Sequence, residues 1–173
     1  MTDRHLVVVD IETTGLDPDR HVPIEVAAIN VDTGEVLHFV PWLDPMKLAD
    51  ADHDALRINR YFERGAYRTM LDQSTTSQQY QRLWEMLRGN TFAGSNPRFD
   101  AQMLERATGY VPSWHYRLAD VSAYVAGALR IYPANLKGLH DCCASLSVVN
   151  DEAHSALADA KATAECFRKA QAR

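Results

Sequence analysis

The sequence is poor in cysteine, and its three cysteines form no recognisable pattern. Cys142, Cys143 and Cys166 are odd in number and contain no Cys-x-x-Cys pair. This excludes a disulfide framework, and the segment from His140 to Cys143 lacks the ligand spacing of a closed zinc site. We expect the three side chains to pack in helices of a protein from a reducing compartment, with the cytoplasm as its default location.

The sequence also lacks a hydrophobic run long enough for a signal peptide or a membrane span. Residues 1–5 carry charges of both signs, and the apolar run that follows stops at Asp10. Repeats, low-complexity tracts and linkers are absent as well. With 173 residues and 46% apolar composition, the chain suits a single domain over residues 1–173, built around one core.

Basic residues are fewer than acidic ones, 18 against 23, which gives a net charge of -5. Non-specific affinity for nucleic acid comes from lysine and arginine displacing counterions, so this balance argues against a protein that coats duplexes. It does not exclude an enzyme that holds a few terminal nucleotides, because divalent cations bound by clustered carboxylates supply positive charge locally.

What the sequence does contain is a series of short apolar runs with strand character. The run HLVVVD at residues 5–10 is rich in β-branched residues, which is typical of a strand buried on both faces. The link Asp32-Thr33-Gly34 predicts a hairpin between two further strands. The predicted strands are 5–10, 24–31, 35–40, 91–93 and 116–118.

Helical spacing dominates the second half of the chain. The predicted helices are 78–88, 97–107, 120–129, 136–146 and 155–170. Asn96 is expected to cap the second of these, with Pro97 in its first turn and Gly109 at its end. A three-strand meander followed by alternating helices and strands predicts a mixed sheet covered by helices, which is an α/β sandwich. Residues 41–77 show no regular pattern.

Asp10 and Glu12 stand at the end of the first predicted strand. Because side chains alternate along a strand, both carboxylates point to the same face. Two carboxylates on one face of a buried strand must pair with cations or become protonated, since like charges in contact do not ionise cheaply. The alternative is a solvated strand end, and an isolated Asp-x-Glu does not decide between the two.

Three further residues complete an inventory suited to phosphodiester hydrolysis. Asp100 lies in the first turn of the helix that starts at Pro97, Asp159 lies early in the final helix, and His154 stands just before that helix or at its start. Each alone has a structural interpretation, such as compensation of the helix dipole. Together they supply oxygen ligands for Mg²⁺ or Mn²⁺ and an imidazole able to act as a base.

These residues lie in three motifs whose order and separation resemble the DnaQ-like, or DEDD-type, 3′–5′ exonucleases of the histidine subgroup. The motifs are DIETTGL from Asp10, NPRFDAQML from Asn96 and HSALADAKAT from His154. Together they span nearly the whole chain, and NLKGLHDCCASL at residues 135–146 resembles the helix before the third motif. The resemblance implies a ribonuclease H-like fold, with a mixed five-stranded sheet of an antiparallel three-strand meander plus parallel strands, flanked by helices.

The resemblance also implies a role for each catalytic residue. Asp10, Glu12 and Asp159 would coordinate one metal ion, Asp10 would bridge to a second, and Asp100 would hold the site through a water molecule. The cofactors would be two Mg²⁺ or Mn²⁺ ions. His154 would deprotonate the water that attacks the terminal phosphodiester of DNA or RNA, releasing a nucleoside 5′-monophosphate.

Substrate contacts are implied in the first two motifs. The backbone of Thr13, Thr14 and Gly15 would meet the terminal sugar, and Leu16 would pack near the last base. Asn96 and Phe99 would add contacts from the second motif. That motif often begins with His-Asn in relatives, whereas this chain has Ser95-Asn96.

A weaker signal comes from four arginines spaced three or four residues apart, Arg57, Arg60, Arg64 and Arg68. A helix here would place them on one face, where Arg57 together with Asn59 would grip phosphates. The competing interpretation is a solvated face, and Gly65 argues against a continuous helix.

Several functional alternatives stay open at this point. The motifs are shared with RNA-trimming exoribonucleases and short-oligonucleotide ribonucleases, and they do not settle the sugar preference. A non-catalytic nucleic-acid-binding module would be favoured by the loss of one of the five residues, but all five are present. A proofreading subunit beside a polymerase, or in another replication or repair complex, differs mainly in its partners. The expected partner in every case is a single strand or a 3′ end, with no membrane, and the oligomeric state is not readable.

Overall fold

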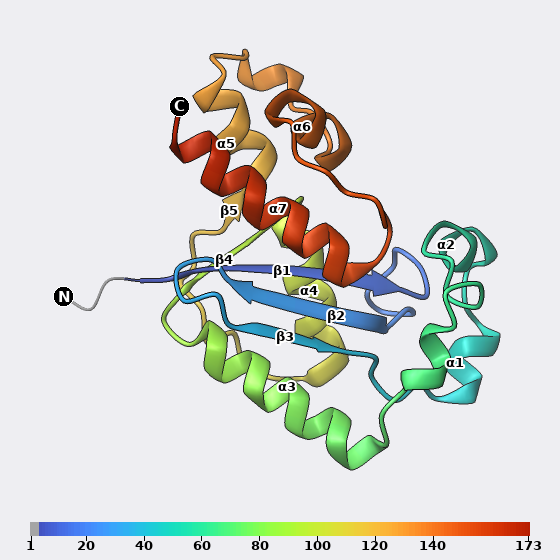
Figure 1. Ribbon diagram of the computed structural model, residues 1–173. Coiled ribbons are helices and arrows are strands. Elements are labelled where there is room, and N and C mark those ends of the chain that lie inside the picture. The colour runs from blue at the N-terminus through green and yellow to red at the C-terminus, as the bar shows by residue number, and fades with distance from the viewer. Residues whose placement is uncertain (1–3) are drawn as a thin grey trace.

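The computed structural model describes residues 4–173 and contains a five-stranded mixed sheet (Figure 1). Its strands are β1 (Leu6–Thr13), β2 (Pro23–Asn30), β3 (Val36–Phe39), β4 (Thr91–Gly94) and β5 (Ala119–Asp120). The spatial order is β3-β2-β1-β4-β5, in which β1 to β3 form an antiparallel meander and β4 and β5 pair in parallel. The predicted sheet is confirmed, although the last strand lies a few residues later than residues 116–118.

The helices lie on both faces of this sheet. They are α1 (Pro45–Ala49), α2 (His53–Ile58), α3 (Gln73–Leu87), α4 (Pro97–Thr108), α5 (Val121–Ala128), α6 (Leu139–Leu146) and α7 (Ala156–Gln171), with short 3₁₀ turns η1 (Ala66–Thr69) and η2 (Pro133–Asn135). In Figure 1, α5, α6 and α7 lie above the sheet, α3 and α4 lie on the other side, and α1 and α2 lie beyond the end of β1.

β1 is the central strand, and its composition follows from that position. Val7, Val8 and Val9 are fully buried because successive side chains enter opposite cores. Val8 packs in the core under α5, α6 and α7, whereas Val7 and Val9 pack against α3 and α4. The uninterrupted β-branched run therefore reflects burial on both faces, as predicted.

Helix α7 crosses the sheet on an alanine-lined face. Ala156, Ala160 and Ala164 have at most 1% exposure, and α7 packs on β1 and β2. Small side chains let the helix approach the strands closely, which brings its first turn near the end of β1 (Figure 1). The Sγ atoms of Cys143 and Cys166 lie 3.7 Å apart in this core, so these cysteines pack in helices as expected.

Two local predictions about α4 have different outcomes. Gly109 ends the helix in the left-handed conformation with φ of 67°, as predicted. Asn96 takes the predicted N-cap position, with Pro97 in the first turn, but its φ is 60° and its side chain makes no capping hydrogen bond. Its backbone N–H instead donates to Asp120 Oδ2 at 3.2 Å, which joins the start of α4 to the end of β5.

The segment after β3 folds into short turns around a small core of its own. Ile24, Val40, Leu43, Tyr61 and Ala66 are buried together there. Helix α2 ends at Ile58, and Arg60 has a positive φ of 52°. The four arginines of this segment therefore do not share one helical face, which agrees with the objection that Gly65 raised against a continuous helix.

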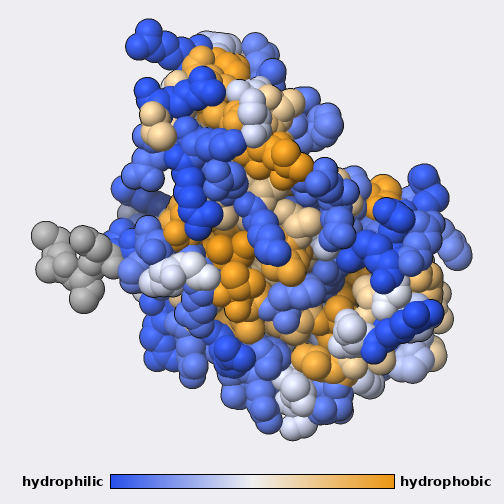
Figure 2. Space-filling view, in the orientation of Figure 1, coloured by the Kyte–Doolittle hydropathy of each residue, from blue (hydrophilic) through white to orange (hydrophobic). Residues whose placement is uncertain are grey.

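The surface agrees with this layered arrangement. Figure 2 shows hydrophilic residues over most of one face, with hydrophobic residues gathered in the middle of that view, where the strands and α7 lie in Figure 1. Among residues 4–173, no helix combines the length and apolar character needed to cross a membrane.

Candidate active site

Two carboxylates of the site lie near the C-terminal end of β1. Asp10 pairs in register with Ala27, and Glu12 pairs with Glu25 on the antiparallel strand β2. Both Asp10 and Glu12 are partly buried, and they project from the same face of the strand, as the spacing of two predicts. β1 thus presents two carboxylates side by side on one face of the sheet, where both are partly shielded from solvent.

A third carboxylate is delivered by the first turn of α4. Asp100 is 4% exposed, and its Oδ1 accepts a hydrogen bond from the backbone N–H of Ile11 at 3.1 Å. Ile11 lies between Asp10 and Glu12, so this single bond fixes the start of α4 against the acidic end of β1.

The segment before α7 and its first turn supply the remaining two residues. Asp159 Oδ2 accepts the backbone N–H of His154 at 3.0 Å, and its Oδ1 accepts the Nδ2 amide of Asn150 at 2.6 Å. His154 is exposed and has a positive φ of 66°. One ligand atom from each of Glu12, His154 and Asp159 lies within 4.8 Å of the other two. The fold therefore brings together residues that are separated by up to 147 positions in the sequence.

Electrostatics in this cluster are dominated by burial and mutual repulsion. Burial raises the pKa of Glu12 to about 8, with Asp159 and Glu25 adding to the increase. Burial raises the pKa of Asp100 to about 8 as well, against the stabilising Ile11 N–H bond. The pKa of Asp10 is raised well above its ordinary value by burial and then by Asp100 and Asp159. Without a cation, these carboxyl groups do not all remain ionised at neutral pH.

The loop after β1 is held in place by its own hydrogen bonds. Thr13 Oγ1 donates to the Gly15 carbonyl at 2.7 Å, and Thr14 Oγ1 accepts the Val22 N–H at 3.1 Å. A Cβ on Gly15 would lie 2.6 Å from the His21 ring, so glycine is needed here for close approach rather than for an unusual turn conformation.

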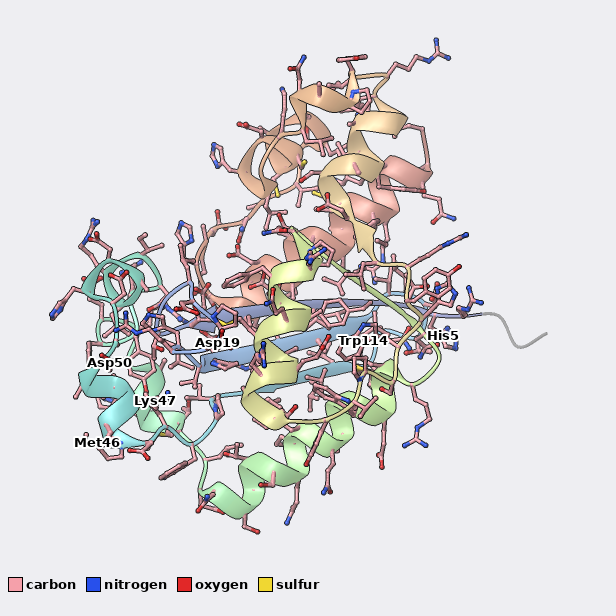
Figure 3. All side chains as sticks on the ribbon, turned by 180° about the vertical axis from the view of Figure 1, so that it is seen from behind. His5, Asp19, Met46, Lys47, Asp50 and Trp114 are labelled. Atoms are coloured by element: carbon pink, nitrogen blue, oxygen red, sulfur yellow. The ribbon has the colours of Figure 1, made fainter. Side chains whose placement is uncertain are left out.

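The same loop is attached to helix α1 at the end of the sheet. The Arg20 guanidinium pairs with Asp50 at 3.3 Å, and Lys47 Nζ donates to the Arg20 carbonyl at 2.9 Å. Figure 3 labels Asp19, Lys47 and Asp50 at this end, with His5 and Trp114 at the opposite end of the sheet. The backbone of residues 13–16 is therefore fixed beside the carboxylates.

The predicted substrate contacts occupy different environments. Leu16 is 78% exposed next to the loop, while Phe99 is half-buried on α4 and Asn96 is exposed just before it. Arg57 pairs with Asp54 at 3.0 Å on the surface. Asn59 is only 2% exposed, and its Nδ2 donates to the Thr13 carbonyl at 3.2 Å. The buried Asn59 side chain therefore holds the backbone of the loop at Thr13.

Comparison with known proteins gives the family. The RNase T family profile, described as exonuclease, matches residues 7–167. The chain belongs to this exonuclease family. The matched range includes all four carboxylates and His154, and the family, a DEDD group, implies divalent metal ions. No curated protein sequence matches the chain.

Solved structures show the fold of this exonuclease family member. E. coli exonuclease I bound to single-stranded DNA, in its zinc form, is 19% identical over 99% of this chain, with a TM-score of 0.74. Exonuclease I from Methylocaldum szegediense is 23% identical over 99% of the chain, with a TM-score of 0.72. In both cases the match covers 41% of the longer exonuclease I chain. The ribonuclease H-like sheet expected from the motifs is confirmed by this likeness.

The residues of this exonuclease suit divalent ions. Four carboxylates supply oxygen donors, and the raised pKa values of Asp10, Glu12 and Asp100 reflect burial that a bound cation would offset. The buried Oδ1 of Asn150, next to Asp159, has no hydrogen-bond partner among the described residues. These donors fit divalent metal ions, and Asp10, Glu12, Asp100 and Asp159 are the residues that would hold them.

Sequence reasoning missed a second polar layer beside the site. Glu25 on β2 is 2% exposed and bonds to Arg64, His38 and Ser155. A signal was present, because a glutamate inside the apolar run PIEVAAIN must find partners if that strand is buried. The identity of the partners was not readable, since they come from three distant segments.

Proposed function

We propose that the chain is a metal-dependent 3′–5′ exonuclease of the histidine subgroup that releases nucleoside 5′-monophosphates from single-stranded DNA ends. The observation that carries this proposal is the convergence of Asp10, Glu12, Asp100, Asp159 and His154 at the end of β1. Carboxylates and an imidazole at one place serve phosphodiester hydrolysis, whereas a binding module would not need so much buried negative charge.

Two Mg²⁺ or Mn²⁺ ions are the proposed cofactors. When bound, they would offset the charge of the phosphate and of the attacking and leaving oxygens. The chain's own contribution is to fix the ligands: the Ile11 N–H orients Asp100, and the Asn150 amide with the His154 N–H orients Asp159. Ligands held in this way need little rearrangement when the cations arrive.

His154 is the proposed general base. Its imidazole stands beside Glu12 and Asp159 and is exposed to solvent, so water reaches it. A proton taken from the attacking water would pass to a ring nitrogen, and the neighbouring carboxylates would stabilise the resulting positive charge. The backbone bond from His154 to Asp159 places the base and a metal ligand as one unit.

The terminal nucleotide is proposed to lie along the loop of residues 13–16. Thr13, Thr14 and Gly15 present backbone groups on a braced turn, and exposed Leu16 offers an apolar contact for the last base. Asn96, just before α4, and Phe99, in its first turn, are the proposed further contacts. Arg57 would bind a phosphate only after breaking its ion pair with Asp54. Asn59 would affect the substrate indirectly, by holding the carbonyl of Thr13.

Single-stranded DNA is the proposed substrate class because of the solved relatives. E. coli exonuclease I has been crystallised with dT13 and with dA16 oligonucleotides, and it matches this chain at TM-scores of 0.70 and 0.72. The net charge of -5 agrees with a protein that holds a short terminal segment rather than a long duplex.

The test is degradation of 5′-labelled single-stranded DNA and of RNA with the same sequence. The wild type, Asp10→Ala and His154→Ala are compared with Mg²⁺, with Mn²⁺ and with chelator, and Asp151→Asn serves as an exposed acidic control. A metal-dependent ladder that shortens from the 3′ end in the wild type and control, but not in the two site variants, supports the proposal. If RNA is degraded faster than DNA, RNA replaces DNA as the proposed substrate. If neither is cleaved, the chain is a binding module rather than an enzyme.

A further inference from the structure

Glu25 is a buried carboxylate directly beside the proposed metal ligands. It stands opposite Glu12 in the β1–β2 register, and its side chain is only 3% exposed. A buried carboxylate next to a like-charged neighbour needs compensating partners. Glu25 has them, since bonds from His38 and Arg64 lower its pKa to about 2 in spite of burial.

The partners of Glu25 come from three separate segments. His38 Nε2 on β3 lies 2.9 Å from Glu25 Oε1, and the Arg64 guanidinium pairs with Oε2. Ser155 Oγ donates to Oε1 at 3.4 Å. Ser155 precedes α7 at the position where serine usually caps a helix, yet its side chain makes no capping bond. Its hydroxyl joins the residue after His154 to β2 instead.

Arg64 extends this network to the other side of Glu12. Its Nε donates to the Asn59 carbonyl at 2.8 Å, while its other end pairs with Glu25. Asn59 in turn donates to the carbonyl of Thr13, the residue after Glu12. A bonded path therefore runs from Ser155 through Glu25, Arg64 and Asn59 to Thr13, the residue next to Glu12.

We propose that Arg64 is a positioning residue for the catalytic centre, bridging Glu25 and the Asn59 carbonyl so that the end of β1 and the start of α7 keep a fixed relation. This inference rests on the proposed exonuclease function. Arg64 needs no contact with substrate for this role, and its side chain is 21% exposed. The planar guanidinium suits the task because it donates in two directions at once, whereas an ammonium is a point charge.

The first test compares Arg64→Ala and Arg64→Lys with Arg60→Ala, an arginine of the same segment whose partner Glu63 is on the surface. Steady-state degradation of 5′-labelled single-stranded DNA with Mg²⁺ gives kcat and KM. We expect Arg64→Ala to lose about 10-fold to 100-fold in kcat with little change in KM, which is the usual effect of removing a residue that orients ligands. Millimolar guanidinium chloride should restore part of the loss in Arg64→Ala and nothing in Arg60→Ala.

Arg64→Lys keeps a positive charge beside the buried Glu25, so this variant should fold even if Arg64→Ala does not. We expect it to melt near the wild-type temperature and still to show a reduced kcat, because lysine does not reproduce both bonds. Wild-type kcat in both Arg64 variants overturns the inference. A loss of kcat that follows the fraction of unfolded protein, with no rescue by guanidinium, overturns it as well.

Two measurements are independent of activity. Mn²⁺ affinity is measured by calorimetry, and backbone hydrogen exchange is measured over residues 12–16 and 154–159. Arg64→Ala should bind Mn²⁺ about tenfold more weakly and exchange faster in both segments than Arg60→Ala. If the wild type binds Mn²⁺ but cleaves no oligonucleotide, the proposed function fails and these measurements still judge Arg64. Unchanged or tighter Mn²⁺ binding, with unchanged exchange, would count against the positioning role.

Discussion

Asp100 accepts the backbone N–H of Ile11 at 3.1 Å, and this bond fixes the first turn of α4 to the middle of the acidic pair on β1. Ile11 donates from between Asp10 and Glu12, so Asp100 is held near both carboxylates although it belongs to a different layer. Asp100 therefore affects the stability of the fold in two opposite ways. Its hydrogen bond to Ile11 stabilises the fold, and the burial of its ionisable carboxyl group destabilises it. Substitutions can separate the two.

Asp100→Asn should keep the hydrogen bond and remove the charge. Because burial raises the pKa of Asp100 to about 8, we expect the asparagine variant in chelator at neutral pH to be more stable than the wild type by about 1–3 kcal/mol. Asp100→Ala should lose about 1–3 kcal/mol relative to the asparagine variant, since the buried Ile11 N–H is left unpaired. Urea unfolding measures both, and an asparagine variant no more stable than the wild type would contradict the argument.

The stability of the chelated protein should fall as the pH rises. A carboxyl group whose folded pKa is raised binds its proton more tightly in the folded state, so its contribution is fully present below the unfolded pKa and is lost as the pH passes the folded value. For Glu12 that interval runs from 4.5 to about 8. Melting temperatures with chelator should therefore decrease from about pH 5 to about pH 8, and saturating Mn²⁺ should flatten the trend. A flat profile without metal would exclude strong coupling in the cluster.

His154→Ala should separate proton transfer from metal binding. The four carboxylates remain, so Mn²⁺ affinity by calorimetry should change little, while kcat should fall about 10²-fold to 10⁴-fold. His53→Ala, at an exposed position at the start of α2, is the matched control and should behave as the wild type. Loss of Mn²⁺ binding in the His154 variant would make the imidazole a ligand rather than a base.

Leu16→Ala should affect substrate binding without affecting the fold. Leu16 is 78% exposed, so its removal should leave the melting temperature unchanged. If the side chain packs against the terminal base, its loss should raise KM about tenfold. Val111→Ala, another apolar residue with 83% exposure, provides the comparison. An unchanged KM in the Leu16 variant would remove this residue from the substrate contacts.

The sequence predicted most of the sheet because its strongest signals are local. The β-branched run ending at Asp10 and the Asp32-Thr33-Gly34 hairpin fix the meander, and Gly109 fixes the end of α4. The prediction displaced β5 because two residues carry no periodicity. The Asp120 side chain caps α5 by accepting the Ala123 N–H, and it also accepts the distant Asn96 N–H.

The metal-ligand candidates could be named from the motifs, but their supporting residues could not. Asn59 was named with Arg57 as a phosphate contact, and the pattern did not reveal that its side chain is buried and donates to the Thr13 carbonyl. Arg64 was one of four arginines spaced three or four residues apart, and its pairing with Glu25 across 39 residues and its bond to the Asn59 carbonyl distinguish it. Such pairings depend on how loops pack on the sheet, which no local pattern records.

The close packing of α7 on the sheet also sets when the centre can exist during synthesis. Asp159 and His154 are separated from Asp10 by almost the whole chain, and only the docking of α7 on β1 and β2 brings them together. A nascent chain that has left the ribosome only through Leu146 has two of its layers but neither the base nor the last ligand. The proposed nuclease activity therefore requires that α7 has been synthesised and has docked on the sheet, and an interrupted chain that lacks α7 would have no competent centre.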